Sequence, residues 1–144
     1  MDMIPNMIAQ RYRAVQVKTC APGEIVVLLF EGAIRYLGES ATAMRAGDRA
    51  RAGERLNRAH AIVSELCSGL RPVHAPELCA NLQSLYFFCM TQIVEANIHQ
   101  DPERLDAVAR ILDPLRDAFT QVVRKNDANP APGIDASRLQ VHGI

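Results

Sequence analysis

Residues 22–46 read PGEIVVLLFEGAIRYLGESATAMRA, and this stretch decides the fold class of the chain. Its apolar residues recur at intervals of three and four, which is the spacing of one face of an α-helix. Pro22 suits the first turn of such a helix, and Gly47 suits the position just beyond its end. The stretch therefore predicts a long amphipathic helix with one buried row. The residues of that row are Val26, Phe30, Ala33, Leu37, Ala41 and Met44.

Three further segments repeat this helical period, and no segment alternates between apolar and polar residues as a strand would. They cover residues 48–71, 76–100 and 101–125. The connections between them are short, which places consecutive helices side by side in opposite directions. We therefore expect an all-α protein that folds as an antiparallel up-down four-helix bundle.

The length of 144 residues suits one domain, and we assign the four-helix bundle to residues 22–125. Residues 1–21 keep a loose helical period and are expected to form a short N-terminal helical segment that caps the bundle. Residues 126–144 contain the helix-breaking run Asn-Pro-Ala-Pro-Gly. We expect this last stretch to be a flexible, mobile tail.

Pro114 lies inside the fourth predicted helix, where it has no backbone N–H to donate to the carbonyl of Arg110. The apolar stripe nevertheless continues in phase from Leu112 to Phe119. We therefore expect a kinked helix rather than a break, and no direct role for Pro114 in partner binding.

Composition excludes several classes of function. Sixteen Lys and Arg residues balance sixteen Asp and Glu residues, so the zero net charge argues against nucleic-acid binding. No unbroken apolar run is longer than that from Ile25 to Phe30, which is far too short to insert into a membrane. No secretory signal is visible at the start of the chain. We therefore expect a cytoplasmic protein.

The residues also offer little catalytic chemistry. The cysteines form no C-x-x-C pair, and no glycine-rich phosphate loop occurs. Glu95 and His99 are the nearest approach to the ligand pattern of a metal-binding bundle, but they lie at a helix end without matching partners. We predict no enzyme, no cofactor and no metal. A metal-binding helical-bundle enzyme is the alternative.

The first and third helices carry more apolar positions than a bundle core requires. About three-sevenths of each helix suffices. The first helix adds Ile25, Leu28 and Leu29 to its row. The third adds a second row of Cys79, Tyr86, Met90 and Val94. Such a surplus is either covered by the N-terminal segment or a second copy, or left open as a groove for a partner's amphipathic segment. Composition does not choose between these alternatives.

Several stretches, in order along the chain, resemble the flagellar secretion chaperone family FliS. The resemblance extends from Tyr12 to about Lys125. Each stretch is weak alone, but their order and spacing together are specific. The stretches are VKTCAPGEI at 17–25, LLFEGAIRYL at 28–37, NLQSLYFFCM at 81–90, EANIHQD at 95–101 and LRDAF at 115–119.

This resemblance implies a cytoplasmic export chaperone that binds the disordered C-terminal region of flagellin. The chaperone would prevent premature polymerisation and keep flagellin competent for flagellar type III secretion, without ATP or catalysis. The flagellar export gate is a further candidate partner. We expect a monomer or a weak homodimer.

The resemblance, combined with the apolar surplus, yields a set of candidate partner-binding residues. We expect two of them, from the N-terminal segment, to lie on the groove and to rearrange when the client binds. The two asparagines would either bond the client backbone or cap helices. Tyr86 and Met90 would line the groove, with the core as their alternative place. The full set is Ile8, Tyr12, Leu29, Asn81, Leu85, Tyr86, Met90 and Asn97.

Overall fold

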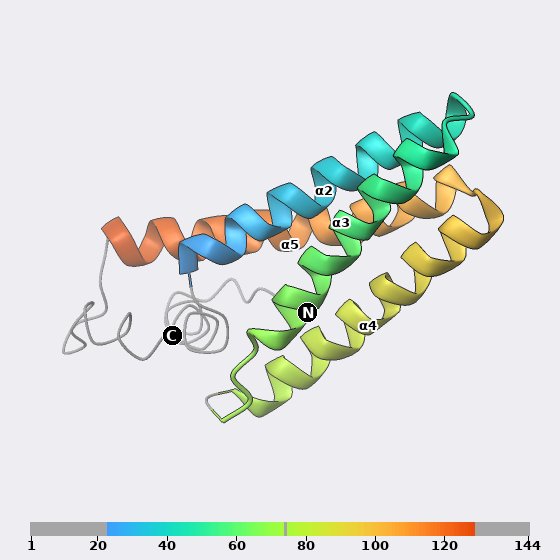
Figure 1. Ribbon diagram of the computed structural model, residues 1–144. Coiled ribbons are helices and arrows are strands. Elements are labelled where there is room, and N and C mark those ends of the chain that lie inside the picture. Colours follow the sequence, from blue (N-terminus) through green and yellow to red (C-terminus); the bar gives the residue numbers. More distant parts are fainter. Residues whose placement is uncertain (1–22, 74, 129–144) are drawn as a thin grey trace.

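The computed structural model describes residues 23–73 and 75–128, and these form four α-helices (Figure 1). None of the described residues lies in a strand, which confirms the all-α prediction. The predicted N-terminal segment and most of the predicted tail lie outside the described residues. The helices are α2 (Gly23–Arg45), α3 (Arg49–Ser68), α4 (Pro76–His99) and α5 (Pro102–Ala128).

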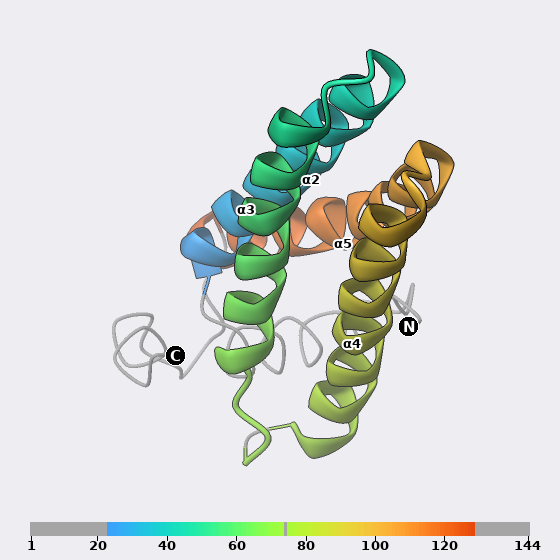
Figure 2. The ribbon, with the colours of Figure 1, turned by 45° about the vertical axis from the view of Figure 1, so that its right-hand side comes forward.

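The four helices pack as an up-down bundle, as the short connections predicted. Helix α2 packs against α3 and α5, and α4 packs against the same two helices. The beginning of α5 lies beside the end of α4, and the two helices then diverge in both views (Figures 1 and 2). Among the four helices described, none combines the length and the apolar character needed to cross a bilayer.

An aromatic cluster joins three of the helices. Phe30 of α2 is fully buried, and its ring centroid lies 6.3 Å from that of Tyr86 on α4. The ring centroid of Phe30 also lies 5.4 Å from that of Phe119 on α5. Leu56 and Val63 of α3 are also buried, so all four helices contribute to one core. The predicted row of α2 is buried as far as Ala41.

Small side chains hold α2 and α3 close together. A Cβ at Gly32 would lie 3.2 Å from Cδ1 of Ile62, so the hydrogen of glycine leaves room for the isoleucine. Further along α2, the buried Ser40 hydroxyl donates to the carbonyl oxygen of Ala52 at 2.8 Å. A buried hydroxyl without a partner would be costly, and this bond removes that cost.

Local hydrogen bonds and backbone conformation set the ends of the helices. Asp48 caps α3, because its Oδ1 accepts from the backbone N–H of Arg51 at 3.1 Å. Gln100 adopts φ 50° and ends α4 in the left-handed conformation. Helix α5 ends at Ala128, three residues beyond the predicted boundary. The run that opposes a helix is Asn-Pro, which begins only at position 129.

We predict that Phe30→Ala lowers the free energy of unfolding by about 3–5 kcal/mol, because it empties the centre of the aromatic cluster. Phe87→Ala on α4 is the matched control, since Phe87 is half exposed and should cost about 1 kcal/mol or less. Urea unfolding followed by circular dichroism measures both. Equal losses for the two variants would contradict the central position of Phe30.

Candidate functional site

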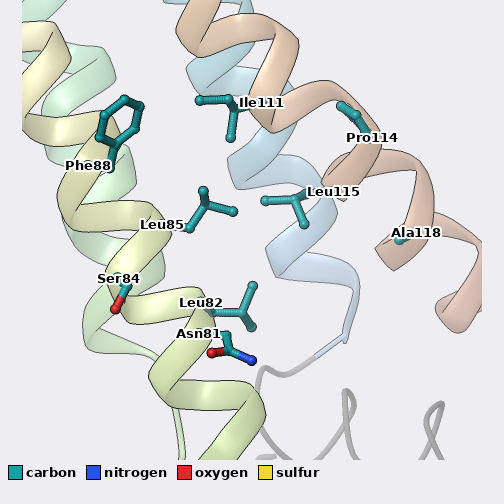
Figure 3. Close-up of a pocket in the computed structure, with 9 residues that line it drawn as sticks. All are labelled: Asn81, Leu82, Ser84, Leu85, Phe88, Ile111, Pro114, Leu115 and Ala118. Atoms are coloured by element: carbon teal, nitrogen blue, oxygen red, sulfur yellow. The ribbon is translucent and has the colours of Figure 1, made fainter. Parts of the chain in front are cut away.

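An apolar groove of about 530 Å³ lies between α4 and α5. Figure 3 shows its lining, with Leu85 of α4 and Leu115 of α5 projecting toward one another across it. The groove is found on the side where the two helices diverge. The lining residues are Asn81, Leu82, Ser84, Leu85, Phe88, Ile111, Pro114, Leu115 and Ala118.

Each wall of the groove is a row of side chains beside the buried row of its helix. On α4, Leu85 and Phe88 each lie one position before a buried residue, Tyr86 and Cys89 respectively. A shift of one residue turns a side chain by about 100° around the helix axis. The wall residues therefore point sideways, toward α5, instead of into the core. On α5, Ile111 of the wall likewise lies one position before a buried residue of its helix, Leu112.

The groove offers an almost purely apolar surface. No charged side chain is among the nine described residues that line it, and its polar groups are those of Asn81 and Ser84. The nearby charges of α5 are engaged with each other, since Arg116 donates to Asp113 at 2.7 Å and to Asp117 at 3.1 Å. Such a surface selects apolar side chains of a partner and does not attract ions.

Phe88 is the largest side chain on this surface that is open to solvent. Half of it is exposed, at 51%. Burying a phenylalanine side chain fully is worth about 1.5–3 kcal/mol, and aromatic anchors of this kind dominate many protein interfaces. A partner that covers Phe88 would therefore gain a large share of its binding free energy there.

Pro114 lines the groove on the α5 side. The helix continues through it, as predicted, from Pro102 to Ala128. Pro114, for which the sequence predicts no direct role in partner binding, contributes its ring to the wall of the candidate groove (Figure 3). A proline at this position also leaves the carbonyl of Arg110 without its usual helical donor.

Two of the predicted partner-binding residues, Asn81 and Leu85, lie in the groove. Tyr86 does not, and its predicted place on the groove is corrected. It is fully buried against Phe30, because it lies in phase with the core residues Leu82 and Cys89. Burial raises the pKa of the Tyr86 hydroxyl well above its usual value of 10.0.

Three further predicted residues lie elsewhere in the bundle. Leu29 and Met90 are half-buried against the core and do not line the groove. Asn97 is exposed near the far end of α4, and its main-chain carbonyl oxygen accepts from Nε2 of Gln100 at 2.8 Å. This bond makes Asn97 part of the turn that ends α4. Residues 8 and 12, the predicted Ile8 and Tyr12, lie outside the described residues.

The α5 wall was missed altogether by the sequence analysis. Its residues Ile111, Leu115 and Ala118 recur at i, i+4 and i+7, which is a helical row that the sequence displays openly. What it does not display is that this row faces Phe88 and Leu85 across an open space. Leu115 lies within the apolar stripe that the sequence predicts to be buried, and the structure shows it half-buried at the groove.

Side chains with catalytic or metal-binding chemistry do not gather within the described part of the chain. Across residues 23–73 and 75–128, no three His, Cys, Asp or Glu side chains come together as a metal site would require. Glu95 and His99 form an exposed pair at 3.3 Å. Burial raises the pKa of the Cys89 thiol to about 11, so this thiol stays protonated near neutral pH.

An uncharged apolar groove on the surface of a helical bundle suits the binding of an amphipathic segment of another polypeptide. Comparison with known proteins gives the family. The family model described as "Flagellar protein FliS" matches residues 5–126. The chain therefore belongs to the FliS family of flagellar secretion chaperones.

Individual relatives match over most of their length. A flagellar secretion chaperone FliS of Vibrio cholerae is 35% identical over 117 residues, which cover 78% of this chain and 86% of the relative. The protein of the same name from Bacillus subtilis is 30% identical over 125 residues, covering 85% and 92%. That of Salmonella typhimurium is 27% identical over 110 residues, covering 76% and 82%.

We predict that Pro114→Ala raises the free energy of unfolding by about 1–3 kcal/mol, because it restores a helical hydrogen bond to the Arg110 carbonyl. Pro102→Ala is the control. Pro102 is the first residue of α5, where proline is well tolerated, so its replacement should change stability by less than about 1 kcal/mol. Urea unfolding of both variants gives the comparison. A loss of stability in Pro114→Ala would show that the packing of α5 needs the proline.

Proposed function

We propose that this chain is an export chaperone whose α4–α5 groove binds the disordered C-terminal region of flagellin. Membership of the FliS family and the name of its relatives, flagellar secretion chaperone, support the export role. The uncharged groove with its half-exposed Phe88 is the observation that carries the binding role.

A groove of this kind suits a client that folds as it binds. A disordered amphipathic segment can place its apolar side chains against Leu85, Phe88 and Leu115 while it becomes helical. Ordering the client costs about 2–5 kcal/mol of the interaction energy, which keeps the affinity moderate. The client is thereby shielded from polymerisation and still released at the export machinery.

The polar groups of the groove have a separate part in this proposal. Asn81 and Ser84 are exposed on α4, and both lie among the lining residues. Their side chains are placed to bond backbone groups of the client where its helix ends. Such bonds orient the bound segment, whereas the apolar wall supplies most of the affinity.

The remaining expectations extend this proposal. The chaperone would act in the cytoplasm before export, as a monomer or weak homodimer, and would deliver flagellin to the flagellar export gate. Ile8 and Tyr12 would lie at the groove and rearrange against the client when it binds. Tyrosine suits such a position, because it pairs an apolar ring with a polar tip.

We predict that Tyr12→Ala weakens binding of a flagellin C-terminal fragment several-fold and leaves the melting temperature of the free chaperone nearly unchanged. The reason is that Tyr12 would contact the client without belonging to the bundle core. Calorimetric titration and thermal melting measure the two effects. A sharp fall in melting temperature with unchanged affinity would make Tyr12 a structural residue.

Two neighbouring phenylalanines test the groove itself. Phe88 lines it and is 51% exposed, whereas Phe87 is 52% exposed but does not line it. We predict that Phe88→Asp weakens binding of the flagellin fragment at least about tenfold, because a carboxylate replaces the apolar anchor. Phe87→Asp, with the same change of charge, should alter the affinity less than about threefold.

Circular dichroism first shows that each variant is folded. Calorimetric titration with the same fragment then measures the affinity of both variants. Equal weakening by the two substitutions would place the client elsewhere on α4. Unchanged binding by Phe88→Asp would remove the groove from the proposal.

A further inference from the structure

We propose that residues 129–144 of the same chain occupy the α4–α5 groove while no client is bound. Docking of this segment does not depend on the proposed function. The competition between this segment and flagellin, by contrast, rests on the proposed function. The groove would then be a regulated site, opened when the client displaces the chain's own C-terminal residues.

The path from α5 to the groove has a suitable length. Ala118 is the groove residue of α5 nearest to the end of that helix, which comes ten residues later at Ala128. Ten helical residues rise about 15 Å. Residues 129–133, Asn-Pro-Ala-Pro-Gly, span about 16–18 Å when extended. The segment can therefore turn back at its prolines and bring Ile134 level with Ala118.

The rest of the segment is long enough to cover the groove. The α5 wall from Ile111 to Ala118 measures about 10 Å along the helix. Residues 134–144 number eleven and span about 16 Å even as a helix, and more when extended. No part of the α5 wall is out of reach.

The chemistry of the segment also matches. The opposite charges of its Asp135 and Arg138 side chains cancel, as suits a groove whose nine described lining residues carry no charge. Four large apolar side chains are spread through residues 134–144. They are Ile134, Leu139, Val141 and Ile144.

A tethered segment has an advantage over a second copy of the chain. Nine residues line the groove, whereas a stable interface needs about 20–30 residues on each side. A surface this small does not sustain a dimer by itself. A segment joined to α5 by a short linker is present at an effective concentration in the millimolar range, which compensates for a small contact.

Methyl NMR of the full chain, without flagellin, tests the docking. The double variant Leu139→Asp, Val141→Asp should release the segment and shift the methyl signals of Leu85, Ile111 and Leu115. Ser137→Ala, in the same segment, is the control and should shift none of them. Unmoved groove signals in the double variant would overturn the proposal.

Two further results would also overturn it. Val94 and Ile98 are exposed on α4 outside the groove, and movement of their methyl signals in place of the groove signals would put the segment on that face. Groove signals that move with protein concentration would make a second copy the occupant.

Competition is measured by titrating the same variants with a flagellin C-terminal fragment. The double variant should bind about three- to tenfold more tightly than the unmodified chain, since its groove is open in a larger fraction of molecules. Unchanged affinity, with groove signals that moved, would overturn the competition. Absence of fragment binding to any form would count against the proposed function, and the NMR result on docking would stand.

Discussion

Phe30 is in contact with aromatic rings of two other helices, and the arrangement of the bundle follows from this contact. Tyr86 on α4 and Phe119 on α5 both pack against it, so α2 holds the middle of α4 and the second half of α5. Leu56 and Val63 close the core from α3. Interiors packed in this way tolerate neither a void nor an extra methyl group easily, which fixes the positions of the helices.

The groove is a consequence of how α4 and α5 leave this shared core. The two helices lie together near the turn between them and diverge along their length (Figures 1 and 2). Their side rows, which include Leu85 and Leu115, face one another across the resulting space (Figure 3). A bundle that brought the two helices together throughout would bury these rows. The divergence leaves apolar area exposed, and its burial by another segment is favourable.

This arrangement separates the residues that maintain the fold from those that are open to binding. Phe30, Tyr86 and Cys89 are buried and support the bundle, whereas Phe88, one residue away from Cys89, is half exposed. Substitution of a groove residue should therefore change binding more than stability. One side of the helical bundle is therefore open to a partner without any loosening of the core.

Helical periodicity and capping residues determined most of the fold. They predicted four helices and the continuation of α5 through Pro114, because these depend on local spacing and local hydrogen bonds. The same period marked Tyr86 as surplus beside a core row, although the structure buries Tyr86 and leaves Leu85 at the groove. It did not separate Tyr86 from Leu85, since neighbouring positions at the edge of an apolar face look alike in a sequence.

Which edge residues are buried and which line a groove was decided by the tertiary structure alone. Tyr86 is buried because Phe30 of another helix lies against it, and Phe88 is exposed because α5 has turned away from α4. A period of 3.6 residues gives the face of each helix. The angle at which two helices diverge depends on side chains from all of the helices that share the core, and no single stretch of sequence contains it.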